Sequence, residues 1–386
     1  MNKKLKVAVF TGTRAEYGHL YWLLKDINKD STLELQLLVS GTHMSPEFGN
    51  TIHEIEKDGF VADEKLEIIL SSDTPVGVAK SMGLGILSFA DALDRLRPDI
   101  IVILGDRFEA LAVAQTSMIL RIPILHLHGG EITEGAYDDS IRHAITKLSY
   151  LHVTANEDYK KRVIQLGESP DRVFNLGAIG LDHISRSSFM SIEELSESLN
   201  FKINKDYIIA TYHPVTLANE PPQPTFKNLL KALDHFKNHQ IIFTYPNADD
   251  GGRKIIQLIQ EYTESDSKRV FSIPSLGHHR YLSAVKHASL VIGNSSSGII
   301  ETPAFCTPAV NIGARQIGRL SADSVLNCGT EESSIFSAIT SSLNTDYKNI
   351  KINNPYGQGN TSQKIIKIIK SFSFDAAKEF YNIKDF

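Results

Sequence analysis

The sequence is poor in cysteine, has no excess of positive charge and lacks a long apolar run. Two cysteines, Cys306 and Cys328, among 386 residues exclude a disulfide framework and a cysteine-based metal knuckle. A net charge of −5 gives no overall basic field that would attract nucleic acid or an anionic membrane. Neither a run of about 18 apolar residues nor a secretory signal is visible. We therefore expect a cytoplasmic protein without a membrane span.

Short runs rich in β-branched residues recur along the chain, with helical stretches between them. Most of the runs are continuously apolar, which is typical of parallel strands covered by helices on both faces. The predicted strands are residues 7–11, 35–39, 100–104, 124–128, 151–154, 173–176, 208–212, 241–245, 270–273, 290–292 and 309–312. This alternation predicts a doubly wound α/β fold. Because a sheet of that many strands would be unusually large, we predict two sheets in two domains.

The domain boundaries are predicted from changes in composition. After the string LGAIG at residues 176–180, a polar helix and a fresh strand begin. A turn-rich linker over residues 353–360 precedes a predicted helix over residues 361–372. We therefore predict domains at residues 1–180 and 181–360 and a helical tail at residues 361–386. Ligands of open α/β sheets lie beyond the carboxyl ends of the strands, so we expect a site in the cleft between two such domains.

Residues 290–301, with the sequence LVIGNSSSGIIE, carry the most informative motif. A predicted strand ends in a Gly-Asn turn, and three hydroxyls open a predicted helix. The first turn of a helix has unpaired N–H groups and partial positive charge, which suits phosphate at Ser295 and Ser296. Glu301 follows one turn later, where a carboxylate can bind a ribose diol. A serine-capped helix without a ligand explains the same residues equally well.

Two further motifs follow strands of the first domain. In TGTRAEYG at residues 11–18, Arg14 lies where a helix begins and can hold a pyrophosphate bidentately, although a surface arginine is as good an explanation. The motif is not the three-glycine dinucleotide fingerprint, which disfavours NAD. Asp106 also lies between a strand and a helix, and its residue type suits either a helix cap or a catalytic carboxylate.

A cluster of titratable residues follows the strand at residues 124–128. Alternation places His126 and His128 on one face, but no third ligand motif accompanies them, so a zinc site is a minority interpretation and we expect no metal. The other members of the cluster supply acid, base and anion-binding capacity: Glu131, Asp138, Arg142 and His143. In the second domain, His213, Asn247 and Arg315 each follow a strand, although a lone histidine is more often structural.

Eight strings in order resemble the hydrolysing UDP-N-acetylglucosamine 2-epimerases of sialic-acid-type biosynthesis, over essentially the whole chain. They are TGTRAEYG, GDRFEA, HGGE, DDSIRHAITK, HPVT, PNAD, IGNSSSGIIE and GARQIGR. The resemblance implies two Rossmann-like domains in the B-type glycosyltransferase (GT-B) arrangement, with UDP bound by the second. It also implies a homodimer, no cofactor, and a C-terminal helix that packs back on the first domain.

The resemblance also assigns roles to single residues. The UDP contacts that carry over are Arg14, Arg107, His213, Asn247, Ser295, Ser296, Glu301 and Arg315. Asp106 and Asp138 match catalytic carboxylates of the family, which favours catalysis over capping for Asp106. His213 is a further candidate catalytic group. The family's third carboxylate is replaced by His128, so either His128 or Glu131 takes that role. Arg142 and His143 are expected to orient the sugar.

The resemblance implies hydrolysis of UDP-N-acetylglucosamine to N-acetylmannosamine and UDP, through elimination to a glycal and hydration with inversion at C2. HLHGGE and TEGAYDDS also resemble the branch that acts on UDP-2,4-diacetamido-2,4,6-trideoxyglucose for legionaminic acid. A GT-B glycosyltransferase and a non-catalytic UDP-sugar sensor are the alternatives from other classes. The expected partners are the UDP-sugar, UDP and a second copy of the chain, and neither nucleic acid nor a membrane.

Overall fold

The computed structural model describes residues 3–46, 49–70, 74–133, 137–214, 222–246, 252–373 and 377–383. The chain divides into two compact units, each of which has its own parallel sheet. The first unit consists of Met1–His183 and Gly359–Phe386, and the second of Ile184–Gln358. The second unit is therefore inserted into the sequence of the first. The prediction of two doubly wound α/β domains is confirmed.

The first unit is built on a seven-stranded sheet with the order β3-β2-β1-β4-β5-β6-β7. All of its neighbouring strands are parallel. The strands are β1 (Leu5–Thr11), β2 (Leu33–Ser40), β3 (Glu64–Leu66), β4 (Ile100–Leu104), β5 (Ile124–Leu127), β6 (Leu151–Thr154) and β7 (Val173–Asn175). The helices are α1 (Arg14–Lys29), α2 (Ile52–Lys57), α3 (Pro75–Leu96), α4 (Phe108–Ile119), α5 (Tyr137–Leu148), α6 (Glu157–Gln165) and α14 (Thr361–Ser371), and α7 (Asp182–Arg186) leads into the second unit.

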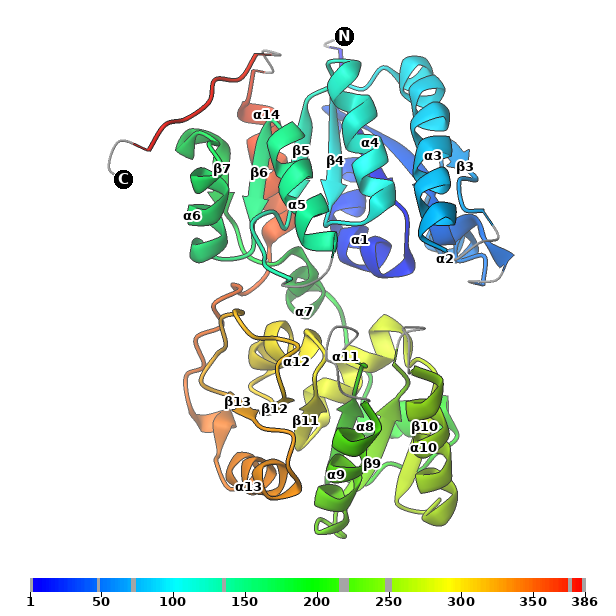
Figure 1. Cartoon of the computed structure of the whole chain (residues 1–386), viewed down its shortest axis with the longest axis vertical. Helices are drawn as coiled ribbons and strands as arrows, with labels where there is room; N and C mark the ends of the chain where they lie inside the picture. Colours follow the sequence, from blue (N-terminus) through cyan, green and yellow to red (C-terminus); the bar gives the residue numbers. More distant parts are fainter. Residues whose placement is uncertain are drawn as a thin grey trace. The chain divides into compact units, whose positions relative to one another are not determined.

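Helices cover both faces of this sheet because successive residues of a buried strand face opposite sides. Val7 and Val9 of β1 belong to a core with α1 and α14, whereas Ala8 and Phe10 belong to a core with α3 and α4. Figure 1 shows α4 and α5 in front of the strands and α14 behind them. The amide groups of Thr361 and Ser362 donate to the buried Asp182 carboxylate at 2.7 and 2.8 Å, and this cap fixes the start of α14.

Helix α3 meets a test for membrane-spanning helices, although the sequence analysis expected no membrane span. By length and composition alone it is apolar enough to cross a membrane, and it is the one such helix among the described residues. One third of its most apolar window is buried. An ideal Cβ at Gly85 would lie 3.3 Å from the Ala112 side chain, so α3 packs closely on α4. Core helices of globular α/β proteins meet the same test of length and composition.

The second unit has a six-stranded parallel sheet with the order β10-β9-β8-β11-β12-β13. Its strands are β8 (Tyr207–Thr211), β9 (Gln240–Thr244), β10 (Val270–Ile273), β11 (Leu290–Gly293), β12 (Ala309–Ile312) and β13 (Val325–Cys328). Its helices are α8 (Ile192–Leu199), α9 (Pro222–Asp234), α10 (Gly252–Ser265), α11 (Gly277–His287), α12 (Ser297–Ile300) and α13 (Glu332–Leu343). Ile208 and Ala210 of β8 pack with α9, α10 and α13 in one apolar core.

Candidate functional site

In the first unit, the polar motifs gather where β1, β4 and β5 end. These strands are neighbours and run in the same direction, so their carboxyl ends lie at one edge of the sheet. Arg14 follows β1, Asp106 follows β4, and His128 follows β5. Parallel α/β sheets bind ligands at this edge.

Asp106 is bound by an arginine and does not cap a helix. The N-cap residue of α4 is Arg107, which makes no side-chain cap hydrogen bond, so the capping interpretation of Asp106 is wrong. The Asp106 carboxylate instead accepts a hydrogen bond from Arg142 of α5. Arg142 is almost fully buried and also donates to the Glu131 carbonyl at 2.9 Å and to the Thr133 hydroxyl at 3.0 Å. Asp106 is thus held as an oriented carboxylate that remains partly exposed.

His128 and Glu131 form a second pair at this edge. The Ile179 amide donates to His128 Nε2 at 3.3 Å, so the other nitrogen, Nδ1, carries the proton and donates to Glu131 at 2.8 Å. His128 has a φ of 64°, in the left-handed region. Both ring nitrogens of His128 are therefore in use, and the Nδ1–H bond fixes the Glu131 side chain relative to the His128 ring.

The histidine expected beside His128 does not form a metal site. His126 is fully buried, and its ring bonds to the Thr146 hydroxyl and the Gly105 carbonyl. Among the described residues, no group of three or more His, Cys, Asp or Glu side chains could hold a metal ion. Asp138 lies in the first turn of α5, where its charge acts on Arg107. His143 Nε2 lies 3.4 Å from Asp139, and burial lowers the pKa of His143.

Arg14 and Arg107 already have acidic partners. Arg14 lies 3.0 Å from Glu54 of α2, and both side chains are about half exposed. Arg107 contacts Glu109 through Nε and Nη2, each at 3.2 Å. Glu109 is fully buried, so the N-cap residue of α4 and the second residue of the helix form a fixed ion pair.

A buried carboxyl that the sequence reasoning missed lies beside this pair. Glu16 accepts hydrogen bonds from the Gly12 amide at 2.7 Å and from the Thr13 amide at 3.2 Å, and it completes the capping box of α1. Burial, together with the nearby charge of Glu109, raises the pKa of Glu16 to about 7. The pattern Thr-x-x-Glu after a strand could have identified the box, although not the depth of burial.

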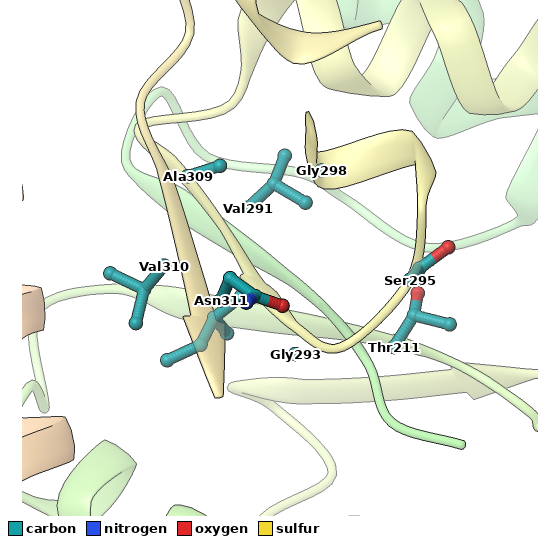
Figure 2. Close-up of a pocket in the computed structure, with 9 residues that line it drawn as sticks. Thr211, Val291, Gly293, Ser295, Gly298, Ala309, Val310 and Asn311 are labelled. Atoms are coloured by element: carbon teal, nitrogen blue, oxygen red, sulfur yellow. The ribbon is translucent and has the colours of Figure 1, made fainter. Parts of the chain in front are cut away.

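In the second unit, the corresponding edge lies at the ends of β8, β11 and β12. A small pocket there is lined by Thr211 and Ser295 on one side and by Val310 and Asn311 on the other (Figure 2). Gly293 has a φ of 139°, and an ideal Cβ on it would lie only 1.8 Å from the Thr211 carbonyl oxygen. Only glycine permits this close approach of two backbones.

Asn294, which the sequence reasoning also missed, holds His213 in place. Its Oδ1 accepts from the His213 amide at 2.7 Å and its Nδ2 donates to the His213 carbonyl at 2.8 Å. The Asn294 carbonyl in turn accepts from Arg315 and from Gln316, both at 2.9 Å. Burial, and then the charge of Arg315, lowers the pKa of His213 to about 4, so its imidazole is neutral near pH 7. Asn294 therefore joins two of the predicted ligand residues.

The helix predicted after the serines is much shorter than expected. α12 is a single turn, and a 3-10 helix (Thr302–Phe305) follows it. Ser296, its N-cap residue, makes no side-chain cap hydrogen bond, so the structure does not show a serine-capped helix. One turn carries little macrodipole. A phosphate bound here would depend on individual amide and hydroxyl groups and on Arg315.

Glu301 is connected to two hydroxyl groups behind the serine turn. Tyr281 donates to the Ser297 hydroxyl at 2.7 Å, and Ser297 donates to Glu301. Glu301 is buried, and burial raises its pKa. The relay fixes the orientation of the Glu301 carboxylate through its Oε2. Asn247, the remaining predicted UDP contact, lies outside the described residues.

The family model described as UDP-N-acetylglucosamine 2-epimerase matches residues 25–370. A similar protein is the GDP/UDP-N,N′-diacetylbacillosamine 2-epimerase (hydrolyzing) of Campylobacter jejuni, with 45% identity over 84% of each chain. The polysialic acid biosynthesis protein P7 of Escherichia coli is 37% identical over 98% of this chain and 97% of its own. The UDP-N,N′-diacetylbacillosamine 2-epimerase (hydrolyzing) of Legionella pneumophila is 34% identical over 95% of this chain and 96% of its own.

A similar solved structure is that of the UDP-GlcNAc 2-epimerase from Neisseria meningitidis bound to UDP-GlcNAc. Its TM-score is 0.81 at 19% identity, and the match covers 95% of this chain and 100% of that one. At this identity the likeness concerns the fold, which it places among two-domain α/β proteins of the GT-B type. The sequence relatives and the family model carry the argument about function.

Proposed function

Because this chain belongs to the UDP-N-acetylglucosamine 2-epimerase family, we propose that it is a hydrolysing nucleotide-sugar 2-epimerase. One observation carries the proposal: the Arg142-bound carboxylate of Asp106 and the Glu131–His128 pair lie at the ligand-binding edge of the first unit. These are acid–base groups without a metal-binding cluster among the described residues. Inversion at a carbon next to a leaving group needs such groups.

The reaction converts a UDP-linked 2-acetamido sugar and water into UDP and the free sugar with inverted C2. The C1–O bond breaks, its electron pair leaves with UDP, and a base removes the C2 proton, which gives a glycal. Water then adds its oxygen to C1, and C2 takes a proton on the opposite face. The transition state for C1–O cleavage resembles an oxocarbenium ion, so carboxylates near the sugar stabilise it.

We assign the proton-transfer roles to the carboxyl groups of Asp106, Glu131 and Asp138. Arg142 binds the Asp106 carboxylate, and it also holds the backbone of Glu131 by donating to the Glu131 carbonyl. His128 orients the Glu131 side chain by its Nδ1–H. His143, beside Asp139, remains a candidate for orienting the sugar, as does Arg142.

We assign nucleotide binding to the second unit, with contributions from two arginines of the first. The proposed UDP contacts are His213, Asn247, Ser295, Ser296, Glu301 and Arg315, together with Arg14 and Arg107. The neutral His213 imidazole can donate one hydrogen bond to a phosphate oxygen. Arg14 and Arg107 have to exchange or share their carboxylate partners, Glu54 and Glu109, when a diphosphate binds.

The names of the relatives favour a diacetamido sugar as the substrate. Two of them, at 45% and 34% identity, are named for N,N′-diacetylbacillosamine, which is 2,4-diacetamido-2,4,6-trideoxyglucose. We therefore place UDP-N,N′-diacetylbacillosamine first. UDP-N-acetylglucosamine, for a sialic-acid-type pathway, is the second candidate, because the 37% identical relative is named for polysialic acid biosynthesis. A homodimer in the cytoplasm completes the proposal.

The test supplies the purified, chelator-treated protein with each substrate in heavy water and follows the products by NMR. The arms are UDP-N,N′-diacetylbacillosamine, GDP-N,N′-diacetylbacillosamine and UDP-N-acetylglucosamine. We expect free sugar with inverted C2, deuterium at C2, and the highest kcat/KM for the first substrate. Intact substrate in all arms contradicts an epimerase and favours a sensor. A product formed only when an acceptor sugar is added indicates a glycosyltransferase instead.

Acids in the first turns of α5 and α6 provide a matched pair of variants. Asp138→Asn removes a proposed proton-transfer group, whereas Asp158→Asn changes an acid of α6 that pairs with Lys161 at 3.5 Å. General acid–base groups typically contribute about 10²–10⁴-fold, so kcat of Asp138→Asn should fall by at least about a hundredfold. Asp158→Asn should leave kcat within about threefold of the wild type. Equal kcat losses in the two variants would argue against the assignment of Asp138.

A further inference from the structure

Two hydrogen bonds join Gly105, the residue before Asp106, to strand β5. The Gly105 amide donates to the Leu127 carbonyl at 3.1 Å. The Gly105 carbonyl accepts from Nε2 of His126 at 2.8 Å. Gly105 has a φ of 80°, and nothing lies within 4 Å of the position of a Cβ. A glycine adopts this φ without strain, and the two hydrogen bonds hold its backbone in this conformation.

The proton of His126 has a defined position. A carbonyl oxygen can only accept, so Nε2 carries the hydrogen in the bond to Gly105. Nδ1 then accepts from the Thr146 hydroxyl at 3.1 Å. Both side chains are fully buried, and burial lowers the pKa of His126 to about 3, which keeps the ring neutral. The Gly105 carbonyl thus selects the tautomer, and the Thr146 hydroxyl holds the ring in place by donating to Nδ1.

Helix α5 reaches Asp106 by two routes. Arg142 and Thr146 lie four residues apart and share one face of the helix. Arg142 binds the carboxylate of Asp106 directly. Thr146 acts through His126 on the peptide group between Gly105 and Asp106. One route fixes the side chain and the other fixes the backbone that carries it.

We propose that His126 is a positioning residue that sets the orientation of Asp106 for the reaction. This inference rests on the proposed function, in which Asp106 acts on the sugar. Without the imidazole, this peptide group loses the hydrogen bond that fixes its carbonyl, and the Asp106 carboxylate shifts relative to its substrate. A displacement of about 1 Å of a catalytic group costs on the order of a hundredfold in rate.

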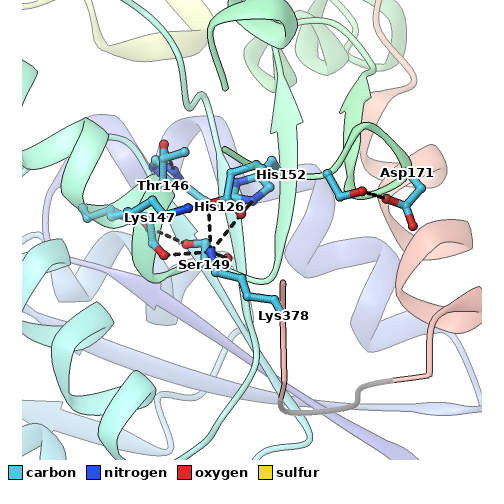
Figure 3. Close-up of polar contacts among 10 residues, drawn as sticks. His126, Thr146, Lys147, Ser149, His152, Asp171 and Lys378 are labelled. Carbon is cyan, nitrogen blue, oxygen red and sulfur yellow. Dashed lines mark hydrogen bonds and ion pairs between the residues drawn. The ribbon is translucent and has the colours of Figure 1, made fainter. Parts of the chain in front are cut away.

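A neighbouring histidine provides a matched control. His152 of β6 is paired with His126 in the sheet register and is also fully buried (Figure 3). Burial lowers the pKa of His152, as it does for His126. Its Nε2, however, bonds to Glu168 at 3.1 Å. Loss of His152 should therefore cost stability without rotating the peptide group beside Asp106.

The test compares four variants in the full chain by kcat, KM, UDP affinity and melting temperature. We expect His126→Leu to lower kcat about a hundredfold while KM changes less than about threefold, because the affected group acts on the reacting carbon. His126→Gln places an amide N–H near the position of Nε2 and should recover at least about tenfold of that loss. Thr146→Val should lower kcat by a smaller factor than His126→Leu does. His152→Leu should keep kcat within about threefold of the wild type, whatever its melting temperature.

Two outcomes overturn the inference: equal kcat losses in His126→Leu and His152→Leu, or no recovery in His126→Gln. If His126→Leu fails to fold, the kcat values of His126→Gln and Thr146→Val are compared with that of His152→Leu. The inference then requires a lower kcat in the first two variants than in His152→Leu. A crystal structure of His126→Gln or Thr146→Val adds a readout that does not depend on turnover. A Thr146→Val structure with the Gly105–Asp106 peptide and the imidazole unmoved contradicts the relay. A wild-type protein that is inactive on every nucleotide sugar refutes the proposed function, whereas the crystal structures still test the positioning geometry.

Discussion

Substitution of Asn294 by alanine tests the clamp at the end of β11. The change removes both hydrogen bonds to the His213 backbone, at 2.7 and 2.8 Å, and leaves the Asn294 carbonyl that binds Arg315 and Gln316. Asn294 is fully buried, and His213 is 8% exposed, so water has little access to the groups that lose their partners. The ends of β8 and β11 thereby lose two of their links, while the Asn294 amide still donates to the Thr211 carbonyl at 3.2 Å.

The expected cost follows from the two backbone groups. Each buried donor or acceptor that is left unsatisfied costs about 1–3 kcal/mol, and partial relaxation gives a total of about 2–4 kcal/mol. This is a large share of the roughly 5–15 kcal/mol that stabilises an ordinary domain. Because about 1.4 kcal/mol corresponds to a factor of ten, local opening of this edge should become roughly 30- to 1,000-fold more frequent.

Hydrogen exchange followed by mass spectrometry measures this opening in peptides that cover residues 207–214 and 290–301. Asn311→Ala is the matched control, because Asn311 is also buried at a strand end but its Nδ2 donates to a side chain, that of Asn327, at 2.8 Å. Asn327 is exposed and can bind water instead, so the control should cost about 1 kcal/mol. UDP affinity should fall at least about tenfold for Asn294→Ala. Exchange rates that match those of Asn311→Ala would refute the reasoning. Because Asn311 lines the pocket of the second unit, UDP affinity is compared with that of the wild type alone.

Three further predictions concern buried groups. The folded chain keeps a proton on Glu16 up to about pH 7, whereas the unfolded chain releases it near 4.5, so this residue makes stability fall as pH rises between those values. Glu16→Gln should remove this dependence on pH, and its free energy of unfolding should exceed that of the wild type by about 2–3 kcal/mol at pH 8. Denaturant unfolding at several pH values measures both. Gly293→Ala should cost more than about 4 kcal/mol or prevent folding, whereas Gly298→Ala, with its nearest neighbour 3.8 Å away, should melt within a few degrees of the wild type. Tyr281→Phe removes the outermost donor of the relay to Glu301 and should weaken UDP binding about threefold to tenfold in calorimetry, and an unchanged affinity would mean that the relay is only structural.

The fold could be predicted because the central strands are continuously apolar and lie in a regular alternation with helices. All eleven predicted runs overlap strands of the two sheets. The strands that the prediction missed, β3 (Glu64–Leu66) and β13 (Val325–Cys328), lie at the edges of the sheets. An edge strand has one neighbour and partial exposure, so its sequence need not be apolar, and its pairing depends on tertiary contacts.

The candidate site was less accessible to sequence reasoning than the fold. Motifs that follow strands led to Asp106, Glu131 and His213, because polar residues at that position rarely serve a core. The sequence could not reveal which partner each side chain takes. Asn294 was overlooked because its role depends on the close approach of β8 and β11, and the short α12 could not be inferred from the serine pattern. Such features depend on backbone distances between segments about 80 residues apart.

The insertion of the second unit into the sequence of the first has a consequence for biosynthesis. Ile365, Ile366 and Ile369 of α14 fill the same core as Leu20 and Leu24, and their codons are translated after those of the whole second unit. At about 5–20 residues per second, the ribosome takes roughly ten seconds or more to deliver the intervening segment. During that time the nascent first unit presents an uncovered apolar groove to the cell's chaperones. A premature stop codon shortly before α14 should therefore yield an aggregation-prone fragment, even though every proposed site residue has already been made.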